Sequence, residues 1–224
     1  MSVLSAGNEL PKRTRLQSIL RQSPIVAVIT IDNVEEAVPL ARALVAGGVT
    51  ALELTLRTPA GLAAAAAILK EVPDAVVGVG TILTPDDLAK ARQSGAHFGV
   101  SPGITAALLD AAAQTDLPFM PGIQSASELM EALARGFDIV KLFPAAALGR
   151  PAIQGYAGPF PQVRFCPTGG VGEENFMEWL ALPNVAAVGG SWLASRNDVR
   201  TGNWSTITDL ARRAMDKVRA GKRG

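Results

Sequence analysis

One lysine interrupts an otherwise apolar stretch of the chain. Residues 137–144 read Phe-Asp-Ile-Val-Lys-Leu-Phe-Pro, and the apolar residues around Lys141 predict a short strand that is buried on both faces. A lysine is almost never fully buried without a partner or a chemical task. Pro144 ends the strand. The stretch therefore predicts a primary amine held at the carboxyl end of a buried strand.

A second predicted strand carries polar residues at alternate positions. In residues 51–57 (ALELTLR) every even position is leucine, whereas Glu53, Thr55 and Arg57 share the opposite face. If the leucines pack under helices, these three residues face the interior of the fold. We therefore expect Glu53 and Arg57 to meet Lys141 near the carboxyl ends of the strands.

The simplest alternative is that Lys141 and Glu53 form a buried ion pair that only keeps the strands in register. Buried charges are costly unless they are paired or used. Arg57 adds a second positive group, and two cations beside one acid favour an anion-binding site over a structural pair. Thr81, just after the third predicted strand, is a further candidate for the same site.

Two glycine-rich turns follow the last two predicted strands. Residues 168–170 are Thr-Gly-Gly, and residues 189–191 are Gly-Gly-Ser. Glycine lets the backbone approach an anion closely, and the loops after the seventh and eighth strands of α/β barrels often bind phosphate. Two such turns at the same end of neighbouring strands predict a phosphate site.

Composition excludes several classes of function. The net charge is +1 and 48% of the 224 residues are hydrophobic, which gives no indication of a nucleic-acid or membrane partner. The most apolar helical run, residues 60–69, is about half of the roughly 20 residues that a membrane span needs. With one histidine (His97) and one cysteine (Cys166), we expect no metal, no cofactor and no disulfide, as in a reducing cytoplasm. Cys166 is interpreted as a core residue.

The periodicity predicts eight strand-then-helix units without a linker, which indicates a single (β/α)₈ TIM barrel over residues 1–224. An N-terminal helix over 14–22 precedes the barrel and an amphipathic helix over 205–219 ends it, with a frayed lead-in at 1–13 and a frayed tail at 220–224. An open doubly wound sheet is the alternative, but no G-x-G-x-x-G motif follows the first strand. The predicted strands are 25–31, 49–56, 75–79, 97–101, 117–120, 139–143, 164–166 and 185–188.

Seven short blocks carry a resemblance to a known family: residues 52–58 (LELTLRT), 78–81 (GVGT), 101–103 (SPG), 121–123 (PGI), 141–145 (KLFPA), 164–170 (RFCPTGG) and 189–192 (GGSW). Together they resemble the bacterial 2-keto-3-deoxy-6-phosphogluconate (KDPG) aldolase family over nearly the whole chain. The resemblance implies a cytoplasmic homotrimeric class I aldolase that splits this phosphorylated keto acid into pyruvate and D-glyceraldehyde 3-phosphate, as in the Entner–Doudoroff pathway.

The resemblance also implies a role for each site residue. Lys141 would form the Schiff base, Glu53 would be the general acid/base, and Arg57 and Thr81 would hold the substrate carboxylate. The residues implied to line the pocket or surround the phosphate are Pro102, Phe143, Thr168, Gly169, Gly170, Gly190 and Ser191.

Three positions bear on the substrate. A sister branch that acts on the phosphogalactonate epimer usually lacks the arginine and threonine that this chain has as Arg57 and Thr168, which favours the gluconate substrate. Several relatives carry an arginine where this chain has Thr30, so the resemblance gives no basis for an anion contact from the first strand. Cleavage of 4-hydroxy-2-oxoglutarate, a phosphosugar isomerase or epimerase, and a non-catalytic phosphosugar-binding protein remain as alternatives.

Overall fold

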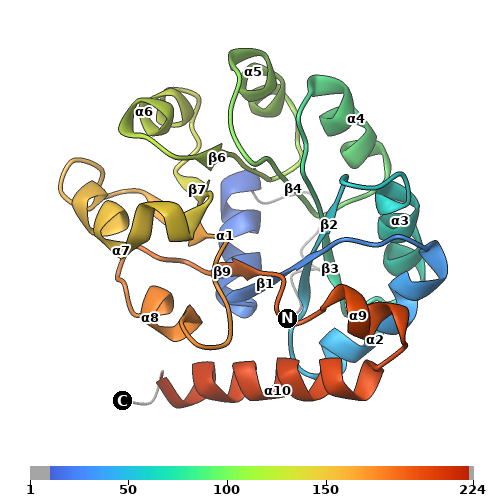
Figure 1. The fold of residues 1–224 in the computed structure, drawn as a ribbon. Coiled ribbons are helices and arrows are strands. Elements are labelled where there is room, and N and C mark those ends of the chain that lie inside the picture. Colours follow the sequence, from blue (N-terminus) through green and yellow to red (C-terminus); the bar gives the residue numbers. More distant parts are fainter. Residues whose placement is uncertain (1–10, 222–224) are drawn as a thin grey trace.

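The computed structural model describes residues 11–221 as parallel strands that curl around a common axis, with most of the helices on the outside (Figure 1). The strands are β1 (Ile25–Ile29), β2 (Ala51–Thr55), β3 (Val76–Gly80), β4 (Phe98–Val100), β5 (Phe119–Met120), β6 (Gly122–Ile123), β7 (Ile139–Leu142), β8 (Arg164–Pro167) and β9 (Val188–Gly190). The helices are α1 (Lys12–Gln22), the 3₁₀ turn η2 (Val34–Glu36), α2 (Ala37–Ala46), α3 (Gly61–Glu71), α4 (Pro85–Gln93), α5 (Ala106–Gln114), α6 (Ala126–Ala134), α7 (Ala145–Tyr156), α8 (Phe176–Leu180), α9 (Arg196–Arg200) and α10 (Trp204–Gly221).

The strands form two hydrogen-bonded sheets with two seams between them. One sheet has the order β5-β4-β3-β2-β1-β9 and the other β6-β7-β8, and every pairing is parallel. At one seam Thr168 bridges to Gly189. At the other, Pro121 separates β5 from β6 because proline has no N–H to donate to a ladder. The alternation of strands and helices predicted from the sequence is confirmed, and its product is a curled parallel sheet.

Helices cover the convex face of the sheet, and some of them begin at clear capping signals. Ser125 caps α6, since its hydroxyl accepts the N–H of Glu128 while the Glu128 carboxylate accepts the N–H of Ser125. Thr84 and Asp87 form the same reciprocal arrangement at α4. Leu52 and Leu54 of β2 are fully buried within this outer layer, as their even positions predict.

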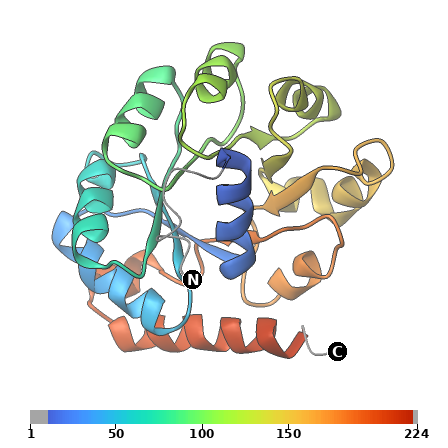
Figure 2. The same cartoon turned by 180° about the vertical axis from the view of Figure 1, so that it is seen from behind.

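A second core fills the concave face, and α1 closes it from the amino-terminal side of the strands (Figure 2). Leu16, Ile19 and Leu20 of α1 are at most 3% exposed and belong to one apolar cluster with inward-facing residues of the strands. The strand residues of this cluster are Val26, Ala51, Val76, Phe98, Val100, Met120, Ile139 and Cys166.

The two ends of the chain differ in part from the prediction. Lys12 and Arg13, expected in a frayed lead-in, belong to α1. The Lys12 amine donates to the carbonyls of Ala112 and Thr115, and Arg13 pairs with Asp138. At the other end α10 extends to Gly221. The predicted lead-in at 1–10 and tail at 222–224 lie outside the described residues. Over 11–221, no helix combines the length and apolar character that crossing a membrane requires.

Candidate active site

Lys141 and Glu53 meet on the concave face of the sheet. The Lys141 Nζ donates a hydrogen bond of 3.0 Å to Glu53 Oε1, and the two residues are 3% and 1% exposed. Lys141 lies on β7 and Glu53 on β2, which belong to different sheets. The pair therefore spans the interior, and the predicted meeting of these two residues is confirmed.

Two glycines of β3 make room for larger side chains, Gly80 for Glu53 and Gly78 for Phe98. Gly80 lies opposite Thr55 in the β2–β3 ladder, and a Cβ at Gly80 would stand 2.2 Å from Glu53 Oε1. Gly78 lies opposite Glu53, and a Cβ there would stand 2.3 Å from the Phe98 ring. Any larger residue at Gly80 would displace the carboxylate. The sequence contains this information only as a Gly-x-Gly repeat, whose meaning depends on the strand register.

Arg57 does not lie inside the sheet, so the predicted interior position is wrong. Strand β2 ends at Thr55, and residues 56–60 form a turn before α3. The Thr58 hydroxyl donates to the Ile31 carbonyl and holds this turn. Arg57 is exposed, and none of residues 11–221 forms a hydrogen bond or ion pair with it. Its guanidinium is a free cation just beyond the carboxyl end of the acid's strand.

Residues predicted around the pair follow the carboxyl ends of neighbouring strands. Thr81, directly after β3, is half-buried and has a φ of 60°, in the left-handed region that is unfavourable for a β-branched residue. The Phe143 ring centroid lies 5.5 Å from Lys141 Nζ, a cation–π distance. Pro102, after β4, is half-buried. Thr168 is 5% exposed and donates to the Cys166 carbonyl.

The two glycine turns lie side by side, as their positions after neighbouring strands predict. A Cβ at Gly189 would stand 2.3 Å from Thr168 Oγ1, so the turns approach each other closely. Gly169 and Gly170 have φ values of 88° and 78°, a backbone conformation that favours glycine. Within residues 11–221 the amides of Gly170 and Ser191 donate to no carbonyl or side chain. These N–H groups remain available to an anion.

Cys166 lies beside the lysine in the β7–β8 ladder, but its surroundings suppress its chemistry. It is paired with Lys141 in register and is 1% exposed. Burial raises the pKa of the Cys166 thiol to about 12, with Glu53 adding to the rise and Lys141 opposing it. The thiol is therefore protonated at neutral pH, consistent with a core residue.

Sequence reasoning did not identify a hydroxyl chain next to Glu53. The Thr55 hydroxyl donates to the Ile29 carbonyl at 2.9 Å, and it lies 3.0 Å from the Thr30 hydroxyl. Because Thr55 has one hydroxyl proton, Thr30 is the donor between the two. Thr30 is then left with acceptor lone pairs. Only the β1–β2 register reveals this contact, since the two threonines are 25 residues apart.

The arrangement has the parts of an enzyme site for carbonyl compounds. A buried amine can add to a ketone, a carboxylate at hydrogen-bond distance can move protons, and free amides beside the site can hold an anion. All of these groups gather at the carboxyl ends of parallel strands, where α/β enzymes place their sites.

Comparison with known proteins agrees with this class of site. Residues 16–210 match the family model described as KDPG and KHG aldolase. The chain is 49% identical over 205 residues to the KHG/KDPG aldolase of Escherichia coli K12, covering 91% of this chain and 96% of that protein. The chain therefore belongs to the KDPG and KHG aldolase family.

Two solved structures of similar proteins contain informative ligands. The KDPG aldolase of Legionella pneumophila, with pyruvate captured at low pH as a covalent carbinolamine intermediate, superposes with a TM-score of 0.86 at 45% identity, over 88% of this chain and 96% of that one. The aldolase of Zymomonas mobilis ZM4 with 3-phosphoglycerate superposes with a TM-score of 0.81 at 43% identity, over 88% and 93% of the two chains.

Proposed function

We propose that this chain is a class I aldolase that cleaves 2-keto-3-deoxy-6-phosphogluconate to pyruvate and D-glyceraldehyde 3-phosphate. The observation that carries the proposal is the 3.0 Å contact between the buried Lys141 amine and the Glu53 carboxylate. Membership of the KDPG and KHG aldolase family, and the carbinolamine in the similar Legionella structure, support it. An isomerase or epimerase would need no covalent adduct.

The reaction begins with addition of the neutral Lys141 amine to the C2 ketone, which gives a carbinolamine. Loss of water gives a protonated imine between Nζ and C2. The C3–C4 bond then breaks, and its electron pair moves through C3 to the imine nitrogen, which forms an enamine. Protonation of the enamine and hydrolysis of the resulting imine release pyruvate and restore the amine.

Glu53 is the proton carrier in this scheme. When the C3–C4 bond breaks, the C4 hydroxyl must lose its proton so that the aldehyde can form, and the Glu53 carboxylate accepts it. The carboxyl group then returns a proton to C3 of the enamine. Its Oε1 lies at hydrogen-bond distance from Nζ. This contact keeps the proton carrier beside the nitrogen that bears the substrate.

Two anion sites hold the ends of the substrate. Arg57 and Thr81, at the carboxyl ends of β2 and β3, bind the C1 carboxylate. The guanidinium of Arg57, which is exposed and has no partner among residues 11–221, supports this role. The free amides of the two glycine turns bind the C6 phosphate. The residues that complete the turns and the pocket walls are Pro102, Phe143, Thr168, Gly169, Gly170, Gly190 and Ser191.

A second substrate, 4-hydroxy-2-oxoglutarate, is favoured by the family description and by the E. coli relative, both of which carry the KHG name. Its keto acid half is the same, so Lys141 and Glu53 would act without change. The phosphogalactonate epimer is the less favoured alternative, because the similar structure named for it is 26% identical to this chain.

The wider organisation follows from the same proposal. The two sheets close into one (β/α)₈ barrel of a single domain, supported by the Thr168–Gly189 bridge and by the N–H of Lys141, which donates to Pro121. We place the enzyme in the cytoplasm as a homotrimer, as the family resemblance implies. Analytical ultracentrifugation tests the trimer directly.

Borohydride reduction in the presence of pyruvate tests the function. We expect the intact mass of the protein to rise by one reduced pyruvyl group and peptide mapping to place that group on Lys141. Lys141→Ala should show neither the adduct nor KDPG cleavage. An adduct that persists in Lys141→Ala would assign the nucleophile to another lysine, and cleavage of KDPG without any adduct would exclude the imine mechanism.

A further inference from the structure

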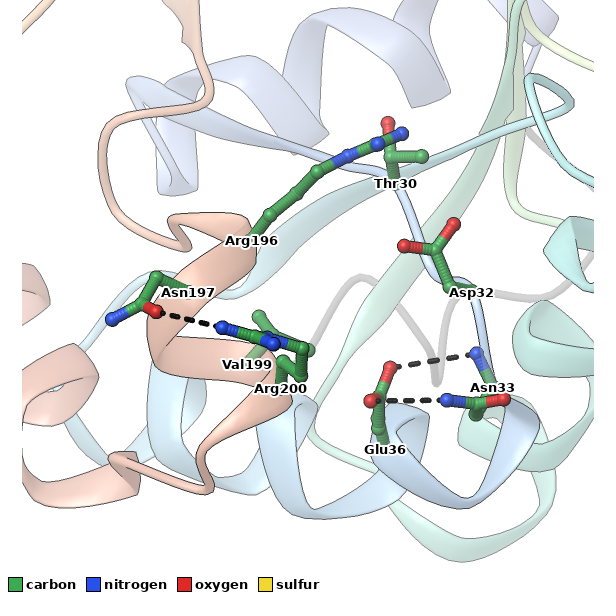
Figure 3. A pocket seen from close by; sticks show the side chains of 8 residues that line it. All are labelled: Thr30, Asp32, Asn33, Glu36, Arg196, Asn197, Val199 and Arg200. Atoms are coloured by element: carbon green, nitrogen blue, oxygen red, sulfur yellow. Dashed lines mark hydrogen bonds between the residues drawn. The ribbon is translucent and has the colours of Figure 1, made fainter.

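A cavity that the proposed mechanism does not use opens beside the first strand (Figure 3). It has a volume of about 310 Å³ and is lined by the segment after β1 and by α9. The lining residues are Thr30, Asp32, Asn33, Glu36, Arg196, Asn197, Val199 and Arg200. Both walls follow the carboxyl ends of their strands, so the cavity lies at the same edge of the sheet as Lys141 and Glu53.

The β1 register connects this cavity to both parts of the active site. On the side of β1 that faces β2, Ile29 pairs with Leu54. The Thr30 hydroxyl lies 3.0 Å from the hydroxyl of Thr55, which is two residues from Glu53 in the sequence. Along β9, Ala27 pairs with Gly190, so the second glycine turn flanks the other side of β1. The cavity thus lies between the acid's strand and the proposed phosphate turn.

Arg196 gives this cavity its chemistry. The side chain extends from α9 toward Thr30 (Figure 3). Within the described part of the chain, the side chains of Arg196 and Asp32 form no hydrogen bond or ion pair, although both line the cavity. The second arginine of α9, Arg200, already donates to Asn197. Arg196 is therefore a cation without a partner among residues 11–221, in a cavity that is also lined by Thr30, whose hydroxyl can only accept.

We propose that Arg196 is a specificity-determining residue that binds the distal phosphate of the substrate from the β1 side of the cavity. The glycine turns offer neutral N–H donors, whereas Arg196 adds a full positive charge and a planar set of donors that suits phosphate. Thr30, whose free lone pairs accept, binds a substrate hydroxyl. The Asp32 carboxylate, on the opposite wall of the cavity, repels the phosphate and so weakens its binding. This inference rests on the proposed aldolase function.

Substrate discrimination tests the proposal. We compare kcat/KM for KDPG and for its unphosphorylated analogue, 2-keto-3-deoxygluconate, in wild type, Arg196→Ala and Arg196→Lys. Arg196→Ala should lower kcat/KM for KDPG, mainly through KM, by about tenfold more than for the analogue. Arg196→Lys should recover part of the loss. Inorganic phosphate should inhibit the alanine variant more weakly than wild type.

Two further variants separate charge from structure. Asp32→Asn should lower KM for KDPG, an effect opposite in sign to that of Arg196→Ala. Arg42→Ala removes the same charge from an exposed ion pair with Glu71, and it should leave kcat/KM unchanged for both substrates. Equal losses for both substrates in Arg196→Ala, or no loss, would overturn the assignment of Arg196. Pyruvate trapping on Lys141 needs no phosphate, so its failure in wild type would instead overturn the aldolase function.

Discussion

The two ends of the strand layer are built for different purposes. At the amino-terminal end α1 covers the concave face with Leu16, Ile19 and Leu20, all buried in an apolar cluster. At the carboxyl end the same concave face carries Lys141 and Glu53. One end excludes water with apolar side chains, and the other holds charged groups that a stable core would avoid. Stability and chemistry are therefore separated along the strand axis.

The separation explains why a costly buried pair is tolerated. Replacing a buried ion pair with apolar residues is often neutral or stabilising, so Lys141 and Glu53 are weak evidence for a structural role. The apolar layer beneath them, which includes Phe98 and Ile139, supplies the packing instead.

The largest effect is expected from Glu53 at the carboxyl end. Glu53→Gln keeps the size of the side chain and can still accept a hydrogen bond from Lys141, but it cannot carry a proton. Borohydride trapping of pyruvate should persist, while exchange of the pyruvate methyl protons in D₂O, followed by NMR, should slow by about 10²- to 10⁴-fold. An unchanged exchange rate would show that Glu53 is not the group that carries the proton.

Truncation of α1 should affect stability and leave the chemistry intact. Leu20→Ala removes a side chain that is 1% exposed and should lower the free energy of unfolding by about 2–5 kcal/mol. Ile19→Val at the adjacent position provides a graded control, with an expected loss of about 0.5–1.5 kcal/mol. Urea denaturation measures both. A large fall in kcat per folded molecule would show that the two ends are coupled.

The smallest effect should come from His97, which precedes β4 at the amino-terminal end. Its Nδ1 accepts the Val77 N–H at 2.9 Å, and burial lowers the pKa of His97 below its ordinary value. The folded state therefore favours neutral imidazole. This contribution to stability is fully present above the unfolded pKa near 6.5 and is lost as the pH falls below it. The expected loss is about 1 kcal/mol or less.

A matched variant isolates the histidine from other titrating groups. The Gln side chain of His97→Gln has a carbonyl oxygen that can accept the Val77 N–H without titrating. The difference in unfolding free energy between wild type and this variant should decrease as the pH falls from about 7 to 5. A difference that stays constant over this range would mean that His97 does not titrate differently in the folded protein.

Much of the fold could be predicted because its signals are local. Apolar runs of strand length, punctuated by Gly and Pro, predict the strands to within a few residues. Two helices had no such signal. Gly149 and Pro151 disrupt the pattern of α7, and α9 spans only five residues. The break at Pro121 was also missed, because β5 and β6 contain two residues each.

The candidate site, like the fold, was predicted from the sequence only in part. Alternation in β2 correctly assigned Glu53 to the interior and wrongly continued to Arg57, because the pattern cannot show that the ladder stops at Thr55. The room that Gly80 leaves for Glu53 and the Thr30–Thr55 contact depend on strand register. The cavity beside Arg196 depends on where a five-residue helix packs. None of these contacts can be inferred from the sequence before the strand register and the helix packing are known.

By itself, the sequence determined which residues are buried, which carry charge on strands and where the chain turns, because hydrophobic periodicity and backbone preferences act over a few residues. Only the tertiary structure decided which charges meet: the amine of Lys141 and the carboxylate of Glu53 are 88 residues apart in the chain and 3.0 Å apart in space. Chemistry needs atoms within hydrogen-bond distance, and that distance is set by the register and curl of the whole sheet.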